Sequence, residues 1–240
     1  MLWIPAERTA VIADAHLGYS WAQRRRGELG PIADSRALAK LRAVRDQLAP
    51  ARFLFLGDLV HAPRPCAPER EWIESTLLEL ARDAEVIAVR GNHDRAFARD
   101  FGHLPIHHCQ TWTNGHITAA HGDKLAFAWP EGETVLLGHL HPVISVQDAS
   151  GAAHKLPAFL VGTRCILLPA FSPFARGYDV GSGLPAELAN CFNGSEIQVF
   201  AASGKRVAAL GTLQRALEIV WAENANAAFR FRRPGPKRSA

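Results

Sequence analysis

The sequence predicts an α/β protein with two β-sheets, and two observations point to this fold class. In the first half, short apolar runs alternate with longer amphipathic segments, a pattern typical of βαβ units around a mainly parallel sheet. In the second half, short apolar runs follow one another with little helical periodicity, which indicates a second, more antiparallel sheet stacked on the first. With 240 residues, of which 48% are hydrophobic and 21% charged, the chain can bury a core of this size.

The first half of the chain is expected to hold two helices between its strands. The first begins at Asp34 or Ser35, either of which can act as its N-cap, and ends at about Leu48, because apolar residues recur on one face. The second runs from about Glu69 to Asp83 for the same reason. The expected strands are Thr9–Ala13, Phe53–Leu56 and Val86–Val89 in this half, and Ile117–Ala120, Thr134–Leu137, Ala158–Val161, Cys165–Leu168, Ile197–Ala201 and Val207–Leu210 in the second.

No repeat or linker divides the chain, so a single domain over residues 1–229 is expected, followed by a basic, flexible tail over residues 230–240. The tail holds five of the 27 basic residues and no acidic one, which leaves 22 basic and 23 acidic residues in the body of the chain. The body is therefore close to neutral. We interpret the tail either as a solvated terminus or as a weak, non-specific contact for nucleic acid phosphates.

The cysteines and the apolar runs bear on the cellular compartment. The four cysteines are scattered without a CxxC pair, so neither a zinc ribbon nor a redox motif is indicated. The segment Met1–Asp14 lacks a cationic start followed by an apolar stretch, and no apolar run approaches the ~18 residues of a membrane span. We expect a cytoplasmic protein with no membrane contact.

Histidine, aspartate or asparagine residues follow five of the expected strands at the point where each strand ends. The carboxyl ends of parallel strands open into one crevice, so these side chains are expected to converge although they are far apart in sequence. A single such residue is more often structural, but five in order are hard to explain by packing. The five motifs are Asp14-Ala15-His16, Gly57-Asp58, Gly91-Asn92-His93-Asp94, His121-Gly122-Asp123 and Gly138-His139-Leu140-His141.

These side chains are the donors expected of a metal centre. Carboxylate and amide oxygens with neutral imidazoles suit Mn²⁺, Fe²⁺ or Zn²⁺, and the lack of a nearby cysteine argues against a structural zinc site. Seven candidate ligands exceed what one ion takes, so we predict two ions, ~3.5–4 Å apart, that share Asp58 and activate water against a phosphate ester. The seven are Asp14, His16, Asp58, Asn92, His121, His139 and His141.

His93 is the spare imidazole of the set, because it comes directly after a predicted ligand. It can protonate the departing alkoxide, and Asp94 is a candidate to orient its ring. Asn92 can bind a metal without adding another negative charge. Gly91 lets the backbone turn both Asn92 and His93 toward the crevice.

Four further residues are candidates for substrate binding, each with a plainer alternative. Arg90 either contacts a phosphate or pairs with an acid, and His61 either reaches a phosphate or lies at the rim without chemistry. The segment Tyr19–Arg26, YSWAQRRR, is either a solvated helix face or a substrate-side loop. In the second case Trp21 stacks on a base, and Arg24 with the arginines after it holds phosphates.

As a set, the motifs resemble those of the calcineurin-like metallophosphoesterases, over about residues 9–175. The resemblance implies a four-layer αββα sandwich of two mixed β-sheets flanked by helices, with two metal ions at the strand ends and His93 as the acid. It also implies how the ligands divide between the ions. One ion is held by Asp14, His16, Asp58 and His141, and the other by Asp58, Asn92, His121 and His139.

Four stretches narrow the resemblance to the bacterial DNA ligase-associated phosphoesterases. They are AHLGY at Ala15–Tyr19, RGNHDR, GHLHP at Gly138–Pro142, and LPAFLVGTRCILLPAFSPFARG at Leu156–Gly177. This narrower resemblance implies a DNA-repair setting, phosphodiesterase or endonuclease activity, and a DNA ligase or helicase as possible partner. Mn²⁺ is the metal we expect, with Fe²⁺ or Zn²⁺ as alternatives.

Three functions stay open on the sequence alone. The first is a phosphodiesterase or nuclease that acts on DNA or another nucleotide-containing diester. The second is a phosphomonoesterase for a nucleotide or lipid-sugar, since two metal ions activate water against either kind of ester. The third, a non-catalytic scaffold, is disfavoured because the full ligand set and His93 are present. The basic tail and YSWAQRRR favour nucleic acid, whereas the near-neutral body argues against a broad basic face for duplex DNA.

Overall fold

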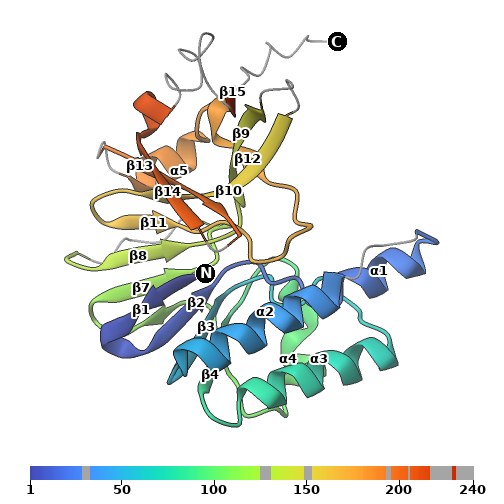
Figure 1. Cartoon of the computed structure of the whole chain (residues 1–240). Coiled ribbons are helices and arrows are strands. Elements are labelled where there is room, and N and C mark those ends of the chain that lie inside the picture. Colours follow the sequence, from blue (N-terminus) through green and yellow to red (C-terminus); the bar gives the residue numbers. More distant parts are fainter. Residues whose placement is uncertain are drawn as a thin grey trace. The chain divides into compact units, whose positions relative to one another are not determined.

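The computed structural model describes residues 1–28, 33–124, 131–148, 153–192, 196–204, 206–216 and 229–230. The chain divides into two compact units, each of which is described by itself. The first unit comprises Met1–His139 and Ala170–Arg176, and the second comprises Leu140–Pro169 and Gly177–Ala240. Figure 1 shows the elements of both, coloured along the sequence.

A five-stranded sheet forms the centre of the first unit. Its strands lie side by side in sequence order, and β2 to β5 are parallel while β1 is antiparallel at one edge. The predicted, mainly parallel first sheet is therefore confirmed. The short strands β1 and β5 were not expected, because three residues are too few to give a periodic pattern. The strands are β1 Leu2–Ile4, β2 Thr9–Ile12, β3 Arg52–Leu56, β4 Glu85–Val89 and β5 His107–Cys109.

Four α-helices of the first unit connect these strands: α1 Tyr19–Arg25, α2 Ala33–Leu48, α3 Ala67–Leu80 and α4 Phe97–Phe101, with short 3₁₀ turns at Pro5–Glu7 (η1) and Asp94–Ala96 (η2). Helices α2 and α3 run side by side (Figure 1), and the Glu79 carboxylate on α3 accepts hydrogen bonds from Arg42 and Arg45 on α2. Helix α3 ends three residues before the expected Asp83. The predicted pair of helices is otherwise present.

Asp34 has a different role from the one expected of it. It lies inside α2, which begins at Ala33, and its side chain is only 7% exposed. Its carboxylate accepts the backbone N–H of Gly18 at 2.9 Å and that of Ser20 at 3.0 Å. These N–H groups stand at the start of α1 and have no partner within that helix, so Asp34 fixes the beginning of α1 instead of capping α2.

The hydrophobic core of the first unit lies between the sheet and helices α2 and α3. Alternate residues of β2, β3 and β4 point to the helices, as expected for strands whose side chains alternate between faces. Val11, Leu54, Leu56, Ile87 and Val89, on the opposite face, are also buried. Both faces of the sheet are thus covered, which explains the nearly continuous apolar runs of these strands. The strand residues on the helix side are Ala10, Ile12, Phe53, Phe55, Val86 and Ala88.

The first unit contains three more strands: β6 Trp112–Thr113, β7 Ile117–Ala120 and β8 Thr134–Leu137. Strand β7 pairs with β6 in antiparallel and with β8 in parallel orientation. The predicted bounds of β7 and β8 are confirmed to the residue.

The second unit is mostly antiparallel. Strand β10 pairs with β9, β11 and β13, β13 pairs with β14, and β9 also pairs with β15 and, in parallel, with β12. The antiparallel character expected of the second half is confirmed for these strands, whereas β7 and β8 pair in parallel. The α/β class with two mixed sheets and helices is also confirmed. The elements are β9 Pro142–Asp148, β10 Ala153–Val161, β11 Cys165–Leu167, β12 Tyr178–Asp179, η3 Val180–Ser182, α5 Ala186–Cys191, β13 Gln198–Ser203, β14 Arg206–Thr212 and β15 Phe229–Arg230.

Two remaining expectations concern the tail and the membrane. Arg230, the first cation of the expected tail, lies in β15 beside Gln147 of β9. The other four, Arg232, Arg233, Lys237 and Arg238, fall outside the described residues. Within the described part of the chain, no helix has the length and apolar character needed to cross a membrane.

Candidate metal centre

The expected polar motifs follow the strand ends of the first unit. Asp14 and His16 come after β2, and Asp58 comes after β3. Asn92, His93 and Asp94 follow β4, His121 follows β7, and His139 follows β8. Gly138, between β8 and His139, would place a Cβ atom 2.8 Å from the Asp14 carboxylate, so the ends of β2 and β8 meet. The seventh predicted ligand, His141, belongs to the second unit.

Five of the seven predicted ligands have a left-handed backbone. Side chains make this conformation unfavourable, and such residues gather at functional sites, where the surrounding structure holds them in place. Among the described residues only Arg8 and Ala49 are further non-glycine residues of this kind. Packing alone gives no reason for this coincidence. The five are Asp14 (φ 53°), His16 (φ 47°), Asp58 (φ 47°), His139 (φ 68°) and His141 (φ 52°).

Three predicted ligands converge around the Nε2 atom of a fourth, His121. This atom lies 3.0 Å from Asn92 Oδ1, 3.1 Å from His139 Nδ1 and 3.5 Å from Asp58 Oδ1. Ligand atoms bound ~2.1 Å from one ion stand ~3.0–3.4 Å from one another, so the spacing fits a shared cation. Aspartate and histidine atoms of this group, from Asp58, His121 and His139, all lie within 4.8 Å of each other.

The protonation of His121 supports the same conclusion. Its Nδ1 lies 2.9 Å from the backbone carbonyl of Leu56, which can only accept, so Nδ1 carries the proton. When the ring is neutral, Nε2 turns a lone pair toward the oxygens of Asn92 and Asp58. A cation between these donors satisfies all three, and an imidazole anchored through its other nitrogen is the usual arrangement in metal sites.

Asp58 stands between this group and a second one. Its Oδ1 lies 3.5 Å from His121 Nε2, and its Oδ2 lies 4.0 Å from His16 Nε2. His16 and Asp14 offer ligand atoms within 4.8 Å of one another. Asp14 also accepts the backbone N–H of His139 at 3.0 Å. One carboxylate thus faces both groups, as the predicted bridging role of Asp58 requires.

The centre buries negative charge. Asp14 is 0% and Asp58 2% exposed. Burial raises the pKa of the Asp58 carboxyl, while the nearby His121 opposes the shift and Asp14 adds to it. Two buried carboxylates are costly unless cations accompany them. Together with the oxygen and imidazole donors, this shows that the residues present fit divalent metal ions.

Two glycines make room for the centre. A Cβ atom at Gly91 would lie 2.2 Å from both the backbone nitrogen and Oδ1 of Asp58. Gly91 is not among the glycines with positive φ, so its function is close approach and not the unusual turn that its sequence context indicated. Gly57 combines both needs, with φ at 77° and a Cβ position 2.3 Å from His121 Nδ1.

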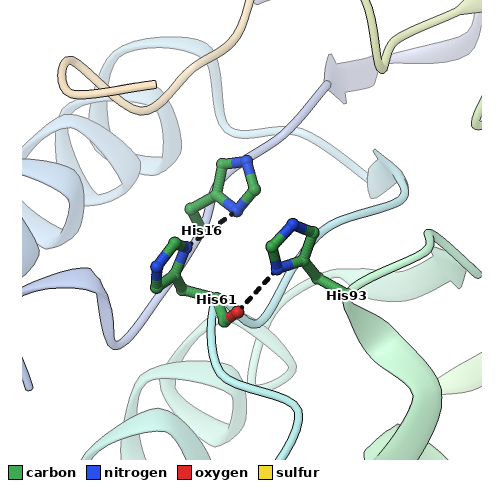
Figure 2. A group of neighbouring side chains, drawn as sticks. All are labelled: His16, His61 and His93. Atoms are coloured by element: carbon green, nitrogen blue, oxygen red, sulfur yellow. Dashed lines mark hydrogen bonds between the residues drawn. The ribbon is translucent and has the colours of Figure 1, made fainter. Parts of the chain in front are cut away.

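His93 lies beside the metal centre, and a hydrogen bond to a backbone carbonyl fixes its ring. Its Nδ1 lies 2.8 Å from the backbone carbonyl of His61, and its Nε2 lies 3.9 Å from Asp58 Oδ2. The dashed line in Figure 2 marks the contact between His93 and the His61 carbonyl. Because a carbonyl only accepts, Nδ1 carries a proton and Nε2 is directed to the Asp58 side. The side chain is 36% exposed, so a substrate can reach it.

Asp94 does not orient the His93 ring, contrary to the expectation from sequence. Its carboxylate is 3% exposed and accepts three backbone N–H groups, from Gly91 at 2.9 Å, Val60 at 3.0 Å and Leu59 at 3.2 Å. Burial raises the pKa of Asp94, and these hydrogen bonds oppose the shift. Asp94 thus ties the loop after β4 to the loop after β3, and the carbonyl of His61 holds the ring.

His61, a predicted substrate contact, lies beside the metal centre. Its ring lies 5.2 Å from that of His16 and 5.4 Å from that of His93, centroid to centroid, and the three side chains face one another in Figure 2. Burial, with the positive charges of His93, Arg26 and Arg25, lowers the pKa of His61 to about 4. The imidazole is therefore neutral near pH 7.

The other predicted substrate contacts stand apart. Trp21 and Arg24 lie on α1, which is a helix and not a loop, with the Arg24 guanidinium 5.6 Å over the Trp21 ring. Arg90 is exposed, and its backbone N–H bonds to the carbonyl of Cys109 at 2.9 Å. Among the contacts described for the first unit, none joins these three side chains to the predicted ligands.

Two aromatic neighbours of the centre, Tyr19 and Phe174, were not expected from the sequence. The Tyr19 ring lies 4.8 Å from that of His61 and stacks on Phe174 at 5.8 Å. Tyr19 is the last residue of the AHLGY stretch and follows the predicted ligand His16 by three positions. A position close to the metal centre could therefore have been predicted for it from the sequence. No local sequence pattern pointed to Phe174, because its contact with Tyr19 joins residues that are far apart in the sequence.

The chain is similar to known proteins in sequence and in fold. The family model described as "Calcineurin-like phosphoesterase" matches residues 7–160. Among solved structures, the nuclease MPE of Pseudomonas putida is similar, with a TM-score of 0.59 and 24% sequence identity over 87% of this chain and 90% of that chain. This likeness shows a shared fold. No curated protein matches the sequence significantly.

Proposed function

This chain belongs to the calcineurin-like phosphoesterase family, and from that premise we propose that it hydrolyses phosphodiester bonds with two divalent metal ions, Mn²⁺ first among them. That it is a metal-dependent phosphoesterase follows from the family. The observation that supports the dinuclear arrangement is the position of Asp58, whose two oxygens face His121 on one side and His16 on the other.

The residues divide into those that hold metal and those that act on substrate. Asp58, Asn92, His121 and His139 would hold one ion, and Asp14, His16 and Asp58 would hold the other, with His141 as the remaining proposed ligand. A pair of bound divalent ions supplies an activated water and positive charge for the oxygens of the scissile phosphate.

His93 is proposed to protonate the leaving oxygen. Its Nδ1 is bound to the His61 carbonyl, so only Nε2 is available to carry a second proton toward substrate. Nε2 lies 3.9 Å from Asp58, the carboxylate that would bind both metal ions. A proton delivered there neutralises the departing alkoxide as its bond to phosphorus breaks.

We further propose that the diester is DNA, in a repair setting with a ligase or helicase as partner. The similar fold of a bacterial nuclease supports a nucleic acid substrate. The stretch Leu156–Gly177, with its resemblance to the DNA ligase-associated phosphoesterases, supports the repair setting. Cleavage of single-stranded, nicked and flapped DNA tests the substrate, and a change in the cleaved ends when a ligase is added tests the partnership.

The deciding experiment compares two chromogenic esters. Wild type, Asp58→Asn and Asp46→Asn are assayed with Mn²⁺ on bis-p-nitrophenyl phosphate and on p-nitrophenyl phosphate. Asp46 is an exposed aspartate on α2 and serves as the matched control. We expect diester cleavage by wild type and Asp46→Asn and none by Asp58→Asn. Cleavage of the monoester alone would transfer the assignment to a phosphomonoesterase, and cleavage of neither ester with any divalent metal would contradict catalysis.

A further inference from the structure

Four aromatic rings form a row that begins beside the centre. His93 stacks on His61 at 5.4 Å, His61 meets Tyr19 at 4.8 Å, and Tyr19 stacks on Phe174 at 5.8 Å with the planes 16° apart. The rings come from the loops after β4 and β3, from the first residue of α1, and from the segment Ala170–Arg176. Four separate parts of the first unit thus supply one row of neighbouring rings, in which Tyr19 is tilted by 57° against His61.

This row, His93-His61-Tyr19-Phe174, does not belong to the hydrophobic core. Phe171 is 7% exposed and packs in the core, whereas Phe174, three residues later, is partly exposed and is not among the core residues. Tyr19 is also partly exposed, and its hydroxyl accepts a hydrogen bond from Gln23 Nε2 at 2.6 Å. The polar tip of Tyr19 is therefore occupied, and what the row offers to a ligand is flat ring surface.

The segment that follows Tyr19 is rich in arginine. Helix α1 ends in Arg24 and Arg25 and is followed by Arg26, and the charges of Arg25 and Arg26 act on His61. Arg25 is paired with Glu69 and Arg26 lies 3.4 Å from Glu28, while Arg24 is exposed over Trp21. Flat aromatic surface beside positive charge is the combination with which proteins bind unpaired nucleotides, since bases stack and phosphates are attracted.

We propose that Tyr19 and Phe174 bind the base of the nucleoside that is attached to the scissile phosphate, so that the substrate is a nucleotide diester with an unpaired base. The inference rests on the proposed function, because it takes the phosphate to sit at the metal centre. In a duplex both faces of a base are covered by its neighbours, and the base must leave the stack to reach Phe174. Single-stranded ends, flaps and small nucleotide diesters are therefore the preferred class.

The test measures the contribution of the base by itself. Dissociation constants are determined by calorimetry with Mn²⁺ present for thymidine 5′-monophosphate and for 2-deoxyribose 5-phosphate, which carries the same sugar and phosphate without a base. We expect the wild type to bind the nucleotide roughly tenfold more tightly. In Phe174→Leu this ratio falls to near one, while the dissociation constant of the sugar phosphate stays at the wild-type value. Tyr19→Phe keeps the ring and keeps the ratio.

A matched control and a stability measurement separate binding from folding. Trp112→Leu removes a partly exposed ring on β6 that packs under Arg52 and keeps the wild-type ratio. A ratio near one in the wild type, or an unchanged ratio in Phe174→Leu, overturns the inference, as does a wild type that binds neither probe. If Phe174→Leu weakens both probes equally and melts early, the Tyr19–Phe174 stack is structural and the inference is wrong. Failure of the proposed function is seen separately, as no hydrolysis of bis-p-nitrophenyl phosphate.

Discussion

The backbone carbonyl of His61 accepts a hydrogen bond from the Nδ1–H group of His93, with 2.8 Å between nitrogen and oxygen. This bond joins the residue proposed as general acid to the loop that also carries Asp58, so the acid and the bridging carboxylate are positioned by one segment. It also decides which nitrogen of His93 can act, because Nδ1 is occupied and Nε2 is directed to the Asp58 side.

Replacement of His93 by Gln is expected to lower kcat without loss of metal. General acid catalysis contributes typically 10²–10⁴-fold, and the loss should approach that size on a DNA diester, whose leaving alkoxide needs a proton. It should be much smaller on bis-p-nitrophenyl phosphate, because p-nitrophenolate leaves readily without one. Kinetics on both substrates, with the bound Mn²⁺ measured in each variant, test this, and an equal loss on both would contradict the role of His93 as acid.

Replacement of Gly91 by Ala is expected to abolish metal binding. The added Cβ would lie 2.2 Å from Asp58 Oδ1 and from the Asp58 backbone nitrogen, so the bridging carboxylate has to move. Gly115→Ala is the control, because its Cβ meets nothing within 4 Å although φ is 84°. Calorimetric titration with Mn²⁺ should show binding by the control and none by Gly91→Ala. Wild-type affinity in Gly91→Ala would show that the centre does not need this close approach.

Replacement of Asp94 by Asn is expected to destabilise the protein by about 2 kcal/mol, because the amide oxygen replaces a buried carboxylate that accepts three backbone N–H groups. The free energy of unfolding is measured by urea titration of metal-free protein, so that lost metal binding does not enter. Asp83→Asn, at a position outside this network, is the control. A variant as stable as the wild type would restore the alternative that Asp94 acts on the His93 ring.

Glu79 is expected to make stability depend on pH between about 4.5 and about 2. The hydrogen bond from Arg42 lowers the pKa of Glu79 most, and with the hydrogen bond from Arg45 it brings this pKa from 4.5 to about 2. A lowered folded-state pKa stabilises the folded form fully above pH 4.5, and this stabilisation is lost as pH falls through the folded-state value. Glu79→Gln should therefore be less stable than wild type at pH 7, and the difference should shrink at pH 3. An equal difference at both values, by urea titration, would show that the ion pairs contribute nothing. Glu71→Gln, an exposed position on the same helix, is the control.

Much of the fold was predictable because its signals are local. The runs TAVIA, FLFL and EVIAV are apolar without interruption because their sheet is covered on both faces, and β7 and β8 are correct to the residue. The polar residues after the strands were also predictable, since parallel strands bring their carboxyl ends together. The predicted helix boundaries were wrong where tertiary contacts decide them. Asp34 is an example, because its carboxylate accepts hydrogen bonds from the backbone N–H groups of Gly18 and Ser20.

The details of the site were not in the sequence. No sequence pattern predicts that Asp14, His16 and Asp58 adopt positive φ, because aspartate and histidine are found mostly at negative φ. The partner of His93 is a backbone carbonyl, which every residue has, so Asp94 was the only visible candidate. Phe174 meets Tyr19 only because the segment Ala170–Arg176 returns to the first unit, and no local signal records that.

Catalysis is expected to need two metal ions that share Asp58. Metal-free wild type is titrated with Mn²⁺ while the bound ions per chain and the hydrolysis of bis-p-nitrophenyl phosphate are measured in the same samples. We expect activity to rise with the second bound ion, and we expect Asp58→Asn neither to bind two ions nor to hydrolyse the diester. Full activity at one ion per chain, or hydrolysis by metal-free protein, would contradict this expectation.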